Sequence, residues 1–246
     1  MARYRMLLEY DGAPFAGWQR QDNLLTVQGA LEEAAYKFCG ERVTAHAAGR
    51  TDAGVHALAM PAQIDLSGEV DPFRLSEALN YHLKPHPAAV LSAEKCPASF
   101  HVRFSAKERS YRYRIANRRA PLTLDAGRAW RIAQRLDEAA MHEAAQVLVG
   151  RHDFTTFRAS TCQAASPIRT LLSAGVRRDG EDVFIETAAQ SFLHHQVRSM
   201  VGSLVEVGLG RWSQGDFESA FRAIDRTHCG QVAPPEGLYF LAARYD

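Results

Sequence analysis

Residues 107–115, KERSYRYRI, decide the fold class of this 246-residue chain. From Arg109 to Ile115 every second side chain falls on one face of an extended strand, and Ser110 and two arginines fall on the other. The stretch therefore predicts a β-strand that carries Tyr111 and Tyr113 on the same face.

Two kinds of pattern extend this prediction toward the N-terminus. Residues 3–10 alternate in the same way and end at the turn signal Asp11-Gly12, which predicts another strand. Apolar residues at helical spacing follow Thr26, a good N-cap, and stop at Gly40; Asp71-Pro72 opens a second helix in a similar manner. The first hundred residues thus predict a strand, a helix, loops and a second helix.

The second half of the chain predicts three helices and one hairpin. They are expected around residues 141–148, at the turn Asp179-Gly180, near residues 195–207, and after Ser213. Strands and helices mix without regular βαβ alternation, which favours an α+β fold over a doubly wound parallel sheet. We place a boundary near residue 105, giving an N-terminal subdomain of residues 1–105 and a C-terminal subdomain of residues 106–246.

Composition narrows the class of protein only partly. An apolar content of 46% can bury a sizeable core, and the net charge of +1 says nothing about partners. Arginine outnumbers lysine 25 to 4, which is compatible with phosphate recognition or with a GC-rich genome. Four widely spaced cysteines and the lack of a long apolar segment favour a reduced, soluble, cytosolic protein with no membrane contact.

The segment Ala48–His56 is a candidate functional loop. It is small, polar and punctuated by glycine, so its backbone can turn tightly and push Arg50, Thr51 and Asp52 outward. A solvated turn with no function explains the same pattern. Without further information both interpretations stay open.

A basic stretch from Arg103 to Arg119 holds seven cationic side chains and one acid, a net charge of +6. Arginines interleaved with Tyr111 and Tyr113 suit RNA, because guanidinium groups bind phosphates while rings stack on unpaired bases. The alternative is an edge strand protected by charge, with its tyrosines in the core.

The run His194-His195-Gln196-Val197-Arg198 leads into an apolar helix. Adjacent histidines diverge and make a poor metal pair, so they are better explained as core or capping residues. An arginine entering such a helix needs a negative partner. The sequence lacks the motifs of phosphate loops, dinucleotide-binding turns and serine-hydrolase elbows, which argues against ATP, NAD and serine-hydrolase functions.

Taken together, these segments resemble the A-type tRNA pseudouridine synthases over nearly the full length. The matching segments are residues 9–12, 17–21, 48–57, 100–105, 111–113, 152–154, 157–158, 194–198, 201–208 and 236–239. The resemblance implies an α+β fold of two similar halves, whose mainly antiparallel sheets join around a catalytic cleft. It also implies a homodimer that acts on tRNA positions 38, 39 and 40 in the anticodon stem-loop.

The same resemblance assigns roles to five residues. Asp52 would be the nucleophile, and Arg198 would pair with it. Tyr111 would pack on the target uracil and help to remove its C5 proton. Leu238 would form an apolar floor under the base, and Arg50 would help to hold the nucleotide out of the helix. The isomerisation needs no metal or redox cofactor, and the base must be flipped out to be reached.

Two other functions remain compatible with the residues. A non-catalytic RNA-binding protein or chaperone could use the basic stretch without needing Asp52. A hydrolase could use Asp52 as its nucleophile.

Overall fold

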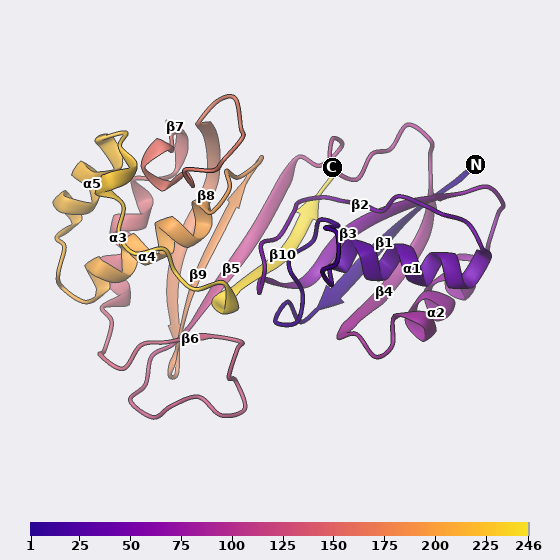
Figure 1. The fold of residues 1–246 in the computed structure, drawn as a ribbon. Helices are drawn as coiled ribbons and strands as arrows, with labels where there is room; N and C mark the ends of the chain where they lie inside the picture. Colours follow the sequence, from indigo (N-terminus) through magenta and orange to yellow (C-terminus); the bar gives the residue numbers. More distant parts are fainter. Residues whose placement is uncertain (246) are drawn as a thin grey trace. The chain divides into compact units, whose positions relative to one another are not determined.

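The computed structural model describes residues 1–245, which form two compact units (Figure 1). The first unit contains Met1–Arg109 together with the end of the chain from Tyr239, and the second contains Ser110–Leu238. The boundary expected at residue 105 lies close to this division. The C-terminal strand, however, belongs to the first unit, whereas we expected it in the second subdomain.

The sheet of the first unit has the order β4-β1-β3-β10, with the short β2 paired to β3. Its strands are β1 (Ala2–Tyr10), β2 (His46–Ala47), β3 (His56–Leu66), β4 (Ala88–Cys96) and β10 (Leu238–Arg244). β1 pairs antiparallel with β3 and β4. β10 runs parallel to β3, where Tyr239 lies opposite His56, which explains why the chain end joins the first unit.

Two helices of the first unit begin where the sequence predicted, and the first also ends where predicted. In α1 (Val27–Cys39) the Thr26 side chain accepts the Gly29 N–H at 3.2 Å, and Gly40 closes the helix in the left-handed conformation. In α2 (Pro72–Leu83) the N-cap is Asp71 and proline occupies the first turn. α2 packs on β4 and α1 packs on α2.

The prediction of loops between the first two helices was wrong, because β3 occupies much of this segment, and β4 after the second helix was not predicted. β3 is central and buried along almost its whole length, so its residues do not alternate between apolar and polar. β4 is a mostly solvent-exposed strand at the edge of the sheet, and its polar side chains hide the pattern as well.

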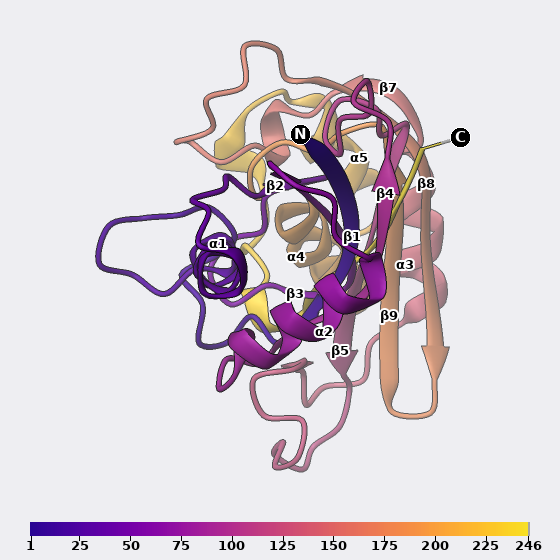
Figure 2. The same cartoon turned by 90° about the vertical axis from the view of Figure 1, so that its right-hand side faces the viewer.

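The second unit contains a sheet of order β5-β9-β8-β7, with β6 paired to β5. Its strands are β5 (Glu108–Ala116), β6 (Trp130–Arg131), β7 (Gly150–Asp153), β8 (Ile168–Asp179) and β9 (Asp182–Ala189). β5 confirms the strand predicted from residues 107–115, with Tyr111, Tyr113 and Ile115 buried on one face. β8 and β9 form the predicted hairpin and run side by side in Figure 2.

Helices gather beside β8 and β9 in the second unit (Figure 1). They are α3 (Glu138–Gln146), α4 (Gln196–Gly208) and α5 (Gln214–Arg222), joined by the short turns η1 (Thr155–Phe157), η2 (Arg226–His228) and η3 (Pro235–Gly237). The capping box expected at Ser213 is present, with Asp216 as its second member. Both units therefore confirm a mixed α/β fold with mostly antiparallel sheets.

Across residues 1–245, no helix combines the length and the apolar content that crossing a membrane would require.

Candidate active site

The candidate loop joins β2 to β3 in the first unit and is anchored at Thr51. The Thr51 hydroxyl lies 2.8 Å from the Tyr10 hydroxyl in the core, and its carbonyl accepts the Trp18 N–H at 3.0 Å. Thr51 is therefore buried, contrary to the expectation that it points outward. Asp52 beside it is half-buried and Arg50 is exposed. The anchored backbone therefore presents one positive side chain, Arg50, and one negative side chain, Asp52, at or near the surface.

Two glycines let the chain after β1 lie directly against this loop. A Cβ atom on Gly12 would lie 2.1 Å from the Val55 carbonyl oxygen, and one on Gly17 would lie 2.8 Å from the Thr51 carbonyl oxygen. Gly17 also has a φ of 97°, which side chains rarely tolerate. The Val55 N–H in turn donates to the Asp52 carbonyl at 3.2 Å. The glycines therefore set the position of the Asp52 backbone.

His56 closes the loop at the start of β3. Its Nδ1 accepts the Gly12 N–H at 3.0 Å, and its ring stacks on Tyr239 with centroids 4.7 Å apart. Nδ1 also lies 3.1 Å from the Asp11 carboxylate. Both ends of the loop are thus held by buried groups, which limits the movement of Asp52.

In the second unit, Tyr111 lies on β5 and is 8% exposed. Its ring meets Phe192 edge to face, with centroids 5.1 Å apart. The aromatic pair fixes the orientation of the Tyr111 ring.

Arg198 lies in the first turn of α4 and is half-buried. Its Nε donates to the Ala233 carbonyl at 2.7 Å, and the Ala233 N–H donates to the Arg198 carbonyl at 3.1 Å. The segment before β10 packs closely against α4. A Cβ on Gly202 of this helix would lie only 1.5 Å from the Gln231 carbonyl oxygen. The position of Arg198 is therefore set by the chain that leads to Leu238.

Tyr113 connects this segment to β5. Its hydroxyl donates to the Pro234 carbonyl at 2.7 Å, and a Cβ on Gly237 would lie 2.5 Å from its ring. Burial raises the pKa of Tyr113 far above its ordinary value, so the hydroxyl stays protonated and acts as a donor. Leu238 follows Gly237 and is 5% exposed. Within the second unit, Tyr111, Arg198 and Leu238 thus belong to one packed framework, while Arg50 and Asp52 share the loop of the first unit.

The adjacent histidines match the expectation of core or capping residues only in part. His194 is exposed, and His195 holds the N-cap position of α4 without a side-chain hydrogen bond to the helix. The rings do not diverge, because the left-handed backbone of His195 brings the two centroids to 4.1 Å.

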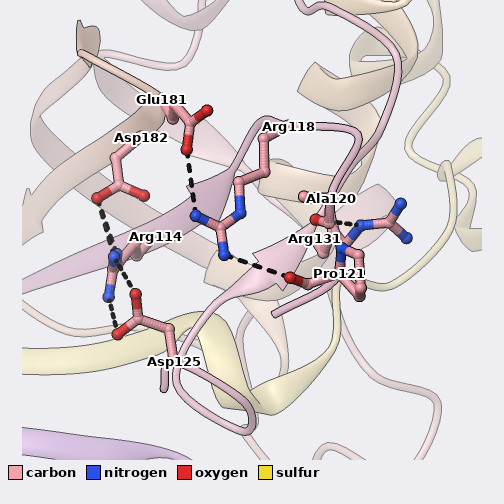
Figure 3. A network of polar contacts seen from close by, with 8 residues as sticks. All are labelled: Arg114, Arg118, Ala120, Pro121, Asp125, Arg131, Glu181 and Asp182. Carbon is pink, nitrogen blue, oxygen red and sulfur yellow. Dashed lines mark hydrogen bonds and ion pairs between the residues drawn. The ribbon is translucent and has the colours of Figure 1, made fainter. Parts of the chain in front are cut away.

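Carboxylates neutralise the middle of the basic stretch (Figure 3). Arg114 pairs with Asp125 at 2.9 Å and with Asp182 at 3.0 Å, and Arg118 pairs with Glu181 at 3.2 Å. Arg112 similarly pairs with Glu186 at 2.7 Å. The arginines in the middle of the stretch therefore tie β5 and the loop after it to the β8–β9 hairpin. In addition, β5 pairs with β9 and, at its C-terminal end, with the short β6, and its tyrosines are in the core, as the alternative interpretation expected of them.

The sequence profile of one family matches residues 6–105 and 144–246, and its description is tRNA pseudouridine synthase. The chain belongs to the tRNA pseudouridine synthase family. Arg50, Asp52, Arg198 and Leu238 lie in the matched ranges, and Tyr111 lies in the interval between them.

Curated relatives of this family member are similar over the full length. A protein of Afipia carboxidovorans is 61% identical over 245 residues and covers 100% of both chains. A protein of Maricaulis maris is 56% identical, covering 100% of this chain and 98% of its own. One from Rhodospirillum centenum is 58% identical and again covers 100% of both chains. All three carry the name tRNA pseudouridine synthase A.

The sequence patterns did not identify the residues that position the loop carrying Asp52. Gly12 was a turn signal, Tyr10 was one of the alternating strand residues, and both entered with Gly17 as parts of the family resemblance. Their contacts join positions about forty residues apart in the sequence, so local patterns carry no trace of them. The available signal was the joint occurrence of these segments with the loop.

Proposed function

We propose that this chain converts uridine to pseudouridine at positions 38, 39 and 40 of the tRNA anticodon stem-loop, with Asp52 as the nucleophile. The observation that carries the assignment is the loop in which buried Thr51 fixes the backbone and leaves the Asp52 carboxylate half-exposed. Family membership supplies the reaction type. The enzyme works on tRNA in the cytoplasm as a homodimer.

The reaction breaks the bond between uracil N1 and ribose C1′, turns the base and forms a bond from C5 to C1′. The C5 hydrogen leaves as a proton and N1 gains one, so the product is an isomer of the substrate. A carboxylate can attack the ribose, attack the uracil ring or remove a proton from the sugar. Each of these routes needs an ionised acid held at a fixed place next to a flipped base.

Four residues support the nucleophile in this proposal. Arg198 supplies the positive charge that keeps the reacting site electrostatically balanced, and its position is set by the Ala233 carbonyl. Tyr111, held by Phe192, packs on the uracil, and buried Leu238 provides an apolar surface for the base. Exposed Arg50 holds the flipped nucleotide through its phosphate.

Tritium release from tRNA labelled at uridine C5 tests the proposal. Only formation of the C5 bond expels that hydrogen, so a synthase releases tritium into water. A hydrolase would instead free uracil that keeps its label, and a non-catalytic RNA-binding protein would change nothing. The absence of tritium release with any tRNA would exclude the proposed reaction.

The role of Asp52 is tested by Asp52→Asn, which should bind tRNA normally and form no pseudouridine. Asp179→Asn is a matched control, because Asp179 is an exposed carboxylate at the β8–β9 turn. Appreciable turnover by Asp52→Asn would refute the nucleophile. Mapping pseudouridine in tRNA from a deletion strain checks the three positions, and light scattering checks for a particle of twice the chain mass.

A further inference from the structure

Two arginines of the second unit turn back onto the same loop. Arg158 follows η1, and its Nη2 donates to the carbonyls of Cys162 at 2.7 Å and Ala164 at 2.8 Å. Arg169 lies at the start of β8, and its Nη1 donates to the carbonyls of Ser166 at 2.9 Å and Ile168 at 2.6 Å. The loop between them is thus bracketed by two guanidinium groups.

This pair of cations has no compensating acid. Within residues 1–245, no carboxylate forms an ion pair with Arg158 or Arg169. Burial, together with the charge of Arg158, lowers the pKa of Arg169. The Arg169 Nε is buried and has no hydrogen-bond partner. Two like charges and a buried unsatisfied donor carry a free-energy cost that a bound anion would offset.

Cys162, which lies in this loop, has a thiol whose pKa is lowered by the groups around it. Burial by itself raises the pKa of Cys162, yet the N–H groups of Ala164 and His194 and the Arg158 guanidinium together lower it. Several donors therefore converge on one small region and favour negative charge there. The Ala159 N–H also donates to the His194 carbonyl at 3.0 Å, which joins the loop to the segment that leads into α4.

We propose that Arg158 and Arg169 bind one backbone phosphate of the RNA substrate. The inference rests on the proposed function, since it assumes that the anion belongs to tRNA. A phosphodiester offers two charged oxygens that match the planar guanidinium donors, and it would balance both cations at once. Because the loop adjoins His194, four residues before Arg198, the phosphate flanks the target nucleotide.

The structural alternative is that the two arginines only brace the loop through its carbonyls. It predicts a loss of stability without any change in how tRNA binding depends on salt. A phosphate contact makes the opposite prediction, because each neutralised phosphate releases a counterion.

The first experiment measures the tRNA dissociation constant of Arg169→Gln at several KCl concentrations. Because Arg158 still faces the same phosphate, the variant should reduce the slope of log Kd against log salt by up to about 0.7 to 0.9. Arg222→Gln is the matched control, since Arg222 is exposed on α5, pairs with Glu218 at 2.7 Å, and should keep the wild-type slope. A folded Arg169→Gln with wild-type slope and affinity would overturn the proposal.

A second experiment does not depend on the folding of that variant. Anticodon stem-loop RNAs with one methylphosphonate each remove one phosphate charge at a time, and one of them should bind the wild-type protein more weakly. Arg169→Gln or, if it fails to fold, Arg158→Gln should show no further loss with that RNA. Equal binding of every methylphosphonate RNA by wild type would refute the phosphate contact.

The two proposals fail in different ways. Wild-type protein that binds tRNA with the expected slopes but releases no tritium would refute the isomerase function and leave the phosphate site. Tritium release together with unchanged slopes in the arginine variants would leave the function and refute the site.

Discussion

Replacing Gly12 with alanine should impair the enzyme by displacing the loop that carries Asp52. The new Cβ would lie 2.1 Å from the Val55 carbonyl oxygen, while ordinary van der Waals contact begins at 3.4 Å. Because the obstructing atoms are backbone, Val55 must move by roughly 1 Å, and a misplacement of that size can cost about 100-fold in rate. The turn from Asp52 to Val55 transmits the movement through its hydrogen bond.

The effect is measured as the single-turnover rate of tritium release from labelled tRNA, together with thermal unfolding. Overpacking should also lower the free energy of unfolding by about 1 to 3 kcal/mol. Gly68→Ala is the control, because a Cβ there meets nothing within 4 Å. Both variants add the same methyl group, so a difference between them reflects the contact with Val55.

One result would refute this reasoning. If Gly12→Ala lost stability but kept the wild-type single-turnover rate, the contact would serve the fold without positioning the nucleophile. A wild-type melting temperature together with a wild-type rate would contradict the close approach itself.

Three further predictions concern charge, burial and pH. Arg198→Met should lower kcat by about 100-fold and leave tRNA affinity almost unchanged, which steady-state kinetics and filter binding can separate; an unchanged kcat would remove Arg198 from the proposed site. Tyr10→Phe removes the hydroxyl that lies 2.8 Å from the buried Thr51 hydroxyl. The free energy of unfolding in urea should fall by about 1 to 3 kcal/mol. An unchanged urea midpoint would show that this hydrogen bond does not stabilise the fold. The Arg114 hydrogen bond lowers the pKa of Asp125 in the folded protein. The pair therefore stabilises the fold at pH values above 3.8, the ordinary aspartate pKa. This stabilisation is lost as the pH falls through the lowered pKa of Asp125 in the folded state. Asp125→Asn should therefore be less stable than wild type at neutral pH by at most about 1 kcal/mol, since the carboxylate is 40% exposed, and a difference that persists in acid would oppose the assignment.

Much of the fold could be predicted because local signals act over a few residues. The caps at Thr26, Asp71 and Ser213 satisfy N–H groups of the adjacent turn, so a single residue marks a helix start. β5 alternates because one of its faces is buried. β3 could not be found in this way, since a strand buried on both faces loses the period of two.

Likewise, only part of the candidate site could be predicted from the sequence. Asp52, Arg50 and the family were accessible from sequence, because the loop motif and its companions are specific as a set. The net charge of the basic stretch was a poorer guide to its surroundings, because a count along the chain leaves out acidic residues on neighbouring strands. Glu186 and Asp182 lie on β9, about seventy residues from the arginines they neutralise.

The sequence by itself determined the helix starts marked by caps, the strand β5 and the resemblance to the family, and it predicted Asp52 as the nucleophile, because these depend on residue types and short spacings. Only the tertiary structure decided that the chain end joins β3, that Gly12 and Gly17 press against the Asp52 loop, and that Arg158 and Arg169 share one uncompensated loop. Such contacts join residues from distant parts of the chain or depend on where a side chain turns. They exist only after the backbone has been brought together, and no local preference of the sequence encodes them.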